Sequence, residues 1–193
     1  MVNIKLKCSC GAVEGKAVGI SPNTGTRLVC YCDDCQAFAR YLGREKEILD
    51  QYGGTDIFQL PPSRIEISKG KEQLRCMRLT PKGMYRWYTD CCKTPIGNTV
   101  SGGMPFVGMI HNFMDNAKSR NTDLGPVLGH VQAKFAKGTL PPDRNHSGVL
   151  LGITLRFLRK ILMAKLRGQG QPSPFFDSKG APVSNPLILP PEA

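Results

Sequence analysis

The sequence predicts a mainly β fold with an added C-terminal amphipathic helix and an extended tail. Short apolar stretches separated by Gly, Pro, Asn and Asp fill residues 2–100, and some alternate as half-buried strands do, for example Val2-Ile4-Leu6 and Ile65-Ile67. Leucines recur at helical spacing only near the C-terminus. At 193 residues with 40% hydrophobic side chains, the chain can bury one core, so we expect one domain with appendages.

Residues 1–112 form the predicted β domain, and residues 113–146 form a predicted loop region. Further strands are expected at 12–18, 27–31, 56–60, 74–79, 84–88 and 95–100, followed by an apolar segment at 102–112. Residues 33–50 are rich in Asp, Gln, Ala, Arg, Glu and Lys, which favours a short helical stretch.

Residues 147–167 are predicted to form an amphipathic basic helix, with Ser147 as its N-cap. One sector of this helix carries five leucines, and another side carries basic residues: Leu151, Leu155, Leu158, Leu162 and Leu166, against Arg156, Arg159, Lys160 and Arg167. We expect the apolar face to pack on the protein's own core or on a second subunit, with a membrane surface as the alternative. No DNA partner is expected, because the aromatic interleaving of single-strand platforms is missing.

The tail at 168–193 is rich in Pro, Gly and Ser, so it is not helical. Its apolar residues Phe175, Phe176, Leu187, Ile188 and Leu189 predict an extended arm laid on the body or on a second subunit. A homo-oligomer formed through the helix or the tail is therefore one expected assembly.

The formal net charge is +11, which favours anionic partners. The first residues contain no apolar run of the length that a secretory signal needs, and nowhere do about 18 uncharged apolar residues follow one another. We therefore expect a cytoplasmic protein, in which thiols stay reduced and clustered cysteines bind metal more often than they form disulfides.

Seven of the eight cysteines stand in close groups. Zinc takes four ligands in structural sites and keeps an open position in catalytic ones. We predict two Zn²⁺ ions, one open site at Cys30, Cys32 and Cys35, and one closed site at Cys8, Cys10, Cys91 and Cys92. Asp90 or water is an alternative to one of the adjacent cysteines, and Cys76 is expected to be a buried apolar residue.

Three motifs carry a resemblance to a known family: C-S-C-G-A-V at 8–13, C-Y-C-D-D-C at 30–35 and C-K-T-P at 92–95. Over roughly residues 4–112 the chain resembles the glutathione-dependent formaldehyde-activating enzyme family, which includes centromere protein V. The resemblance implies an Mss4-like zinc-bound β-sheet fold. It also implies that Cys8, Cys10 and Cys92 are ligands of a structural zinc, and that Cys30, Cys32 and Cys35 are ligands of a zinc on the substrate side. This chain has Thr89 and Lys93 where that family has cysteine and glycine.

Three thiolates on Zn²⁺ leave a net charge of about −1, which favours chemistry between a thiol and an electrophile over hydrolysis. With the resemblance, this predicts a zinc-dependent carbon–sulfur lyase-like enzyme that handles an adduct of glutathione, or a similar thiol, with formaldehyde or another small aldehyde. Arg40 and Arg44 are candidate anchors for the anionic thiol, but solvated helix charge is the favoured interpretation of both. The alternative is a non-enzymatic, zinc-stapled binding module whose basic helix contacts a partner subunit, an acidic membrane or nucleic acid.

Overall fold

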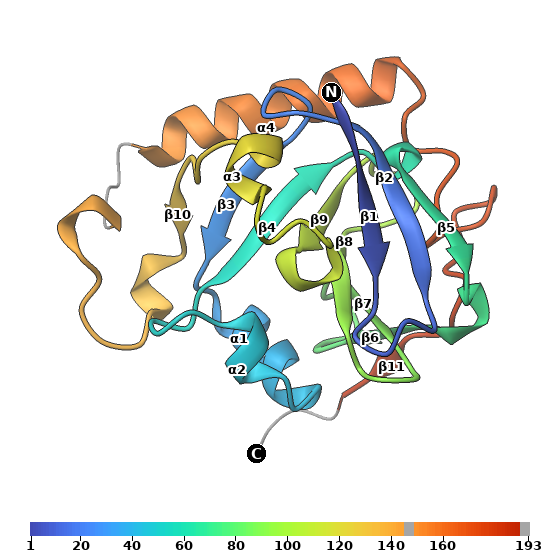
Figure 1. Ribbon diagram of the computed structural model, residues 1–193, viewed down its shortest axis with the longest axis horizontal. Helices are drawn as coiled ribbons and strands as arrows, with labels where there is room; N and C mark the ends of the chain where they lie inside the picture. The colour runs from blue at the N-terminus through green and yellow to red at the C-terminus, as the bar shows by residue number, and fades with distance from the viewer. Residues whose placement is uncertain (145–148, 190–193) are drawn as a thin grey trace.

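The computed structural model describes residues 1–144 and 149–189, and its architecture is mainly β, as predicted. A three-stranded sheet has the order β1-β2-β5, and an eight-stranded sheet has the order β10-β3-β4-β9-β8-β7-β6-β11 (Figure 1). The strands are β1 Val2–Lys7, β2 Glu14–Ile20, β3 Thr26–Cys30, β4 Thr55–Leu60, β5 Ile65–Lys69, β6 Leu74–Arg78, β7 Tyr85–Thr89, β8 Pro95–Thr99, β9 Val107–Ile110, β10 His130–Val131 and β11 Leu187–Ile188. The helices are α1 Asp33–Tyr41, α2 Glu45–Ile48, α3 Arg120–Leu124 and α4 Val149–Leu166.

The strands expected between residues 2 and 100 are all present, with ends that differ by one or two residues. Neighbouring strands pair antiparallel, except that β10 runs parallel to β3 and β11 parallel to β6. The short strands β10 and β11 extend the large sheet at its two edges, so residues beyond 112 complete the same sheet.

The main core lies between the two sheets. The alternation noted in the sequence buries Ile4 and Leu6 of β1 and Ile65 and Ile67 of β5, and these side chains share one cluster with Trp87. Trp87 is fully buried, and its indole N–H donates to Thr99 Oγ1 at 2.9 Å. Each sheet thus buries one face against the other.

The expected helical stretch at 33–50 is two helices, α1 and α2, which follow β3 directly. The break falls at Gly43, whose φ of +64° lies in the left-handed region that ends many helices. These helices cover the end of the large sheet, at the bottom of Figure 1.

The tail lies on the body of its own chain. Phe175 and Phe176 are buried against Trp87, with ring centroids 5.1 and 5.6 Å away. Farther along, Leu187 of β11 pairs with Met77 of β6. The first two apolar anchors are therefore buried in the core, whereas Leu187 and Ile188 stay about half exposed.

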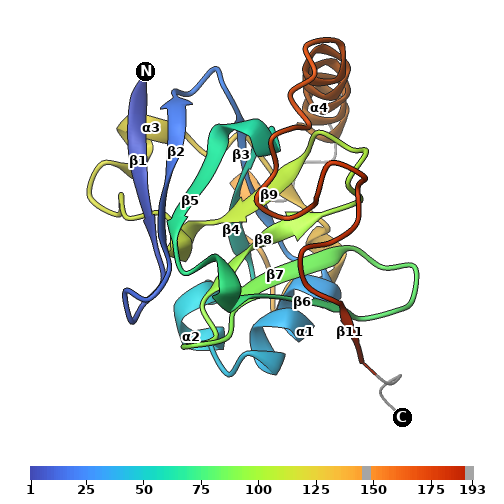
Figure 2. The ribbon, with the colours of Figure 1, turned by 90° about the vertical axis from the view of Figure 1, so that its right-hand side faces the viewer.

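Helix α4 lies along the outside of the molecule and is seen nearly end-on in Figure 2. Its predicted first residues, 147–148, fall outside the described residues. Of the two packing partners expected for its leucines, the protein's own core is wrong: these five side chains are 56–73% exposed, and α4 instead buries Ile153 and Ala164. Packing on a second subunit stays a prediction. Among residues 1–144 and 149–189, no helix has the length and apolarity to cross a bilayer.

Candidate metal centres

Two tight turns build the first group of thiols, the four-cysteine cluster (Cys8, Cys10, Cys91, Cys92). Cys8 and Cys10 lie in the turn between β1 and β2, where Gly11 has a φ of +75° and its N–H donates to the Cys8 carbonyl at 3.0 Å. Cys91 and Cys92 lie in the turn between β7 and β8. The two turns come from different sheets, so this cluster joins the sheets at one end.

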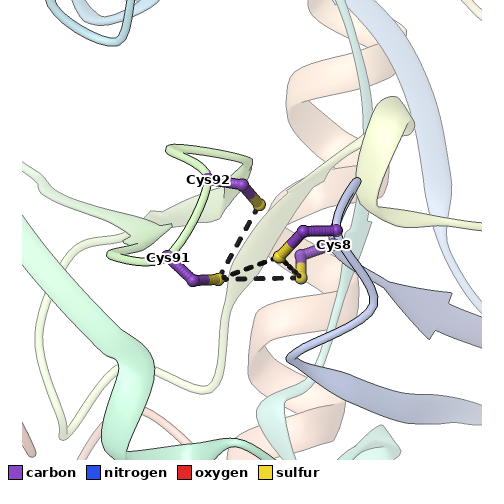
Figure 3. A group of neighbouring side chains, drawn as sticks. Cys8, Cys91 and Cys92 are labelled. Carbon is purple, nitrogen blue, oxygen red and sulfur yellow. Dashed lines mark hydrogen bonds between the residues drawn. The ribbon is translucent and has the colours of Figure 1, made fainter.

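The spacing of the four sulfurs fits one tetrahedral ion. A metal–sulfur distance of about 2.3 Å separates the sulfurs of a tetrahedron by about 3.8 Å. Here Cys8 and Cys10 are 3.5 Å apart, and Cys91 lies 3.9, 3.4 and 3.8 Å from Cys8, Cys10 and Cys92 (Figure 3). All four sulfurs lie within 4.8 Å of one another, so the cluster can hold a metal ion.

The Cys91 sulfur thus lies within 3.9 Å of each of the other three sulfurs. Asp90, its possible replacement, turns away and pairs with Lys93 at 2.8 Å and Arg75 at 3.1 Å. The structure therefore brings together the four cysteines of the predicted closed site and leaves Asp90 outside.

Hydroxyl groups surround Cys92. Burial opposes ionisation of this thiol, but hydrogen bonds from Ser9, Thr89 and Thr94 outweigh it and lower the pKa of Cys92 to about 4. On the other side of the cluster, the Val13 N–H donates to Cys8 Sγ at 3.2 Å. Such donors favour the thiolate form that a metal requires.

Two departures from the resembled pattern have a local explanation. Thr89 stands where that pattern has cysteine, and its hydroxyl lies 3.4 Å from Cys92 Sγ while accepting the Thr94 N–H at 3.1 Å. Lys93 stands at the glycine position and has a φ of +54°, which is uncommon for a residue with a side chain. Its ammonium group is held by Asp90 and lies 5.4 Å from the centre of the Tyr88 ring.

The second group, the three-cysteine cluster (Cys30, Cys32, Cys35), forms where β3 runs into α1. Cys30 is the last residue of β3, and Cys32 is the N-cap of α1, where its sulfur accepts the Cys35 N–H at 3.4 Å. Because the first turn of a helix presents free N–H groups and positive dipole, this location favours thiolates. The three sulfurs lie within 4.8 Å of one another and can hold a metal ion.

The three thiols differ in acidity. Hydrogen bonds from Cys30 and Cys32, assisted by the nearby Arg86 charge, lower the pKa of Cys35 well below its ordinary value. Hydrogen bonding to Cys32 and Cys35, together with burial, raises the pKa of Cys30. The Arg86 charge beside it thus favours the thiolate form of Cys35.

A cavity of about 300 Å³ opens beside the three-cysteine cluster. Apolar side chains from β3, β4, β10, α4 and the neighbouring loops form most of its wall, namely Leu28, Ile57, Met84, Phe106, Val131, Ile153 and Phe157. A few polar side chains also reach it: Asp34, Gln59, Arg86, Asn98 and Thr154. A site with three sulfurs beside a cavity leaves room for an exogenous fourth ligand. The four-cysteine cluster leaves no such room, because its four sulfurs complete the set that zinc takes.

Arg86 is the residue of this site that the sequence pattern did not single out. It is 2% exposed, its Nη2 donates to Asp34 Oδ2 at 2.8 Å, and its Nη1 lies 3.9 Å from Cys35 Sγ. Arg86 is 51 positions from Cys35, so motif spacing did not reveal it. The sequence does contain one signal: a charged residue lies between Tyr85 and Trp87 in a mostly aromatic strand.

The two candidate thiol anchors lie elsewhere. Arg44 donates from Nη1 to the Cys92 carbonyl and from Nη2 to Ser9 Oγ, both at 2.9 Å, so it supports the four-cysteine cluster. Arg40 is exposed on α1. Neither side chain lines the cavity beside the three-cysteine cluster.

The remaining cysteine and two of the histidines are set apart from both clusters. Cys76 is buried in β6, and burial raises its pKa to about 12. His111 and His130 line a different cavity, of about 340 Å³, together with Asp50 and Asp56.

Comparisons with known proteins place the chain in a family. A crystal structure of a Rhodobacter sphaeroides protein is similar to this chain, with 20% sequence identity, a TM-score of 0.42, and coverage of 64% of this chain and 96% of that one. No curated protein matches the chain. The family model described as "Family of unknown function (DUF6151)" matches residues 1–186, and the chain belongs to that family.

Proposed function

We propose that both clusters bind Zn²⁺, and that the ion at the four-cysteine cluster is structural. An all-sulfur donor set at tetrahedral spacing suits zinc, and four protein ligands close the coordination shell. Because the cluster joins the β1–β2 turn to the β7–β8 turn, its metal would staple the two sheets together.

The second ion is proposed to be functional, and the cavity beside the three-cysteine cluster is the observation that carries this proposal. Three thiolates would supply three of the four ligands that Zn²⁺ takes, and the cavity that they line has room for an exogenous fourth. When bound there, Zn²⁺ supplies a site that holds an incoming thiol as its thiolate.

We infer that the reaction joins or separates a thiol and a small aldehyde. The thiol sulfur forms a bond to the carbonyl carbon, the C=O π pair moves to oxygen, and the thiol proton ends on that oxygen; the reverse cleaves the carbon–sulfur bond. Arg86 offsets the negative charge of the thiolates, and the apolar wall keeps water away from the adduct. The motif resemblance supports glutathione and formaldehyde as the first pair to test.

The decisive experiment combines metal content with adduct formation. We expect purified protein to hold two zinc ions and to accelerate formation of S-hydroxymethylglutathione, which NMR measures over time. Cys32→Ser should lose one ion and the acceleration while keeping its circular dichroism spectrum, and Cys76→Ser should resemble wild type. Protein with two zinc ions that leaves the uncatalysed rate unchanged refutes the enzymatic proposal.

The alternative is a non-enzymatic module in which both metals are staples. It is favoured by one feature of the three-cysteine cluster, namely that its sulfurs tie the end of β3 to the first turn of α1. Under this alternative, Cys32→Ser unfolds the protein rather than emptying one site selectively.

A further inference from the structure

The outer side of α4 carries a continuous apolar stripe, the leucine face, formed by Leu151, Leu155, Leu158, Leu162 and Leu166. Their side chains are 56–73% exposed. At about 100° per residue, all five lie within about 80° of one another around the helix. Single exposed leucines are common on proteins, but a stripe of five marks an interaction surface.

The helix cannot rotate to bury this face without breaking its attachment to the body. On the inner side, Ile153 and Ala164 are buried, and Phe157 packs edge-on against Phe106 at 5.1 Å. Arg156 donates to Thr26 Oγ1 and to the carbonyls of Pro22 and Gly25 at 3.0–3.2 Å. The leucine face is therefore held outward.

Beside the leucine face runs a basic groove of about 830 Å³. Five cationic side chains line it: Arg64, Arg156, Arg159, Lys160 and Arg167. The residues that line the groove include no carboxylate, and within the described part of the chain none of the five cations forms an ion pair.

The cations of the groove repel one another. Burial, together with the charges of Arg156, Arg159 and Arg64, lowers the pKa of Lys160 to about 8. The Lys160 ammonium is held by the Asn23 carbonyl at 2.6 Å rather than by an acid. A group of anions placed in the groove would relieve this repulsion.

The leucine face and the basic groove together give α4 the features of an amphipathic helix that lies in the membrane–water interface. Arg159 borders one edge of the leucine face and Lys165 the other, so apolar side chains are flanked by cations with long stems. We propose that α4 docks on an anionic phospholipid surface, with the leucine face inserted at the acyl boundary and the basic groove against the phosphate headgroups.

A second copy of the chain fits this surface less well. Residues 147–167 contain no Asp or Glu, so two leucine faces packed together would bring Arg159 and Lys165 of both chains to one interface without a carboxylate. The formal charge of +11 per chain adds to that repulsion, and it attracts an anionic membrane.

Vesicle flotation tests the proposal with the full-length protein. We expect it to float with vesicles of equal parts phosphatidylcholine and phosphatidylglycerol, and to stay behind with phosphatidylcholine alone. High salt should weaken the binding, because exposed charges are screened. The double variant Leu155→Ser/Leu162→Ser should bind at least about tenfold more weakly, and Arg159→Gln/Arg167→Gln roughly thirtyfold more weakly.

Two control variants carry matched changes outside α4. Leu128→Ser alters an exposed leucine, and Lys82→Gln removes an exposed cation; both should float as wild type does. Absence of flotation with the anionic vesicles overturns the proposal, and so does flotation that the α4 leucine variant leaves unchanged. A dimer in sedimentation velocity that this variant converts to a monomer, without vesicle binding, assigns the leucine face to a second copy instead.

Discussion

Replacing Arg86 by Gln removes the buried positive charge beside the three-cysteine cluster. The guanidinium is 2% exposed and contacts Asp34, Asn98 and the Cys35 sulfur, at 2.8, 3.4 and 3.9 Å. Gln keeps part of the side-chain volume and a hydrogen-bond donor. The change therefore tests the charge more than the packing.

The size of the effect follows from the distance. Two unit charges 3.9 Å apart interact by about 4 kcal/mol at an effective dielectric constant of 20. The Asp34 carboxylate offsets part of this field, and the guanidinium charge is spread over three nitrogens. We therefore expect zinc binding at the three-cysteine cluster to weaken by between about tenfold and a thousandfold.

Competition with a chromogenic chelator measures this affinity for each of the two ions. Arg86→Gln should release one ion more readily and leave the other unchanged, and Arg86→Lys should restore most of the affinity. Arg40→Gln is the matched control, because it removes an exposed cation from the same helix as Cys35. Equal zinc affinities in wild type and Arg86→Gln would refute the electrostatic role assigned to Arg86.

Three further predictions concern other parts of the molecule. Cys91→Ser should weaken zinc binding at the four-cysteine cluster by more than about a hundredfold, measured by chelator competition, whereas Cys76→Ser should keep both ions; equal affinities in Cys91→Ser and wild type would show that Cys91 is no ligand. Phe175→Ala should lower the free energy of unfolding in urea by about 3–5 kcal/mol, because its ring is fully buried on Trp87; a loss no larger than that of Leu187→Ala, at a half-exposed site, would contradict this packing. Because the folded chain holds the Lys160 proton less tightly than the unfolded chain, with a pKa of about 8 against 10.5, stability should rise between those pH values, and Lys160→Met should remove that rise; identical pH profiles would refute it.

The sequence was most informative where local pattern decides structure. Alternation in β1 and β5 correctly indicated their buried faces, because one face of each strand packs on Trp87 and its neighbours. Short spacings also indicate the group of Cys30, Cys32 and Cys35 and the two pairs Cys8/Cys10 and Cys91/Cys92. They do not indicate that the two pairs form one cluster. That union spans 83 positions between Cys8 and Cys91, and it rests on how two hairpins meet in space.

Arg86 shows what spacing leaves out. A buried arginine in a strand gains its role from partners on another element, here Asp34 and Cys35 at the start of α1. No regular separation in the sequence links β7 to α1. The strand pattern shows only that Arg86 is a charged residue where a buried apolar one is expected. Because an unpaired charge is too costly to bury, this indicates that Arg86 has a partner but does not identify it.

Helix α4 shows a different limit. Helical periodicity correctly identified one apolar and one basic side, but periodicity does not state which side meets the body. The chain uses Ile153, Phe157 and Ala164 for that contact, on the side of the helix opposite the leucines. Because Arg156 and Lys160 hydrogen-bond to carbonyls of the 22–25 loop, the helix is fixed with its most apolar face outward. Specific hydrogen bonds hold the leucine face outward, so its exposure is better explained by contact with the apolar region of a membrane than by incomplete packing on the body. The vesicle experiment is therefore the sharpest test of this helix.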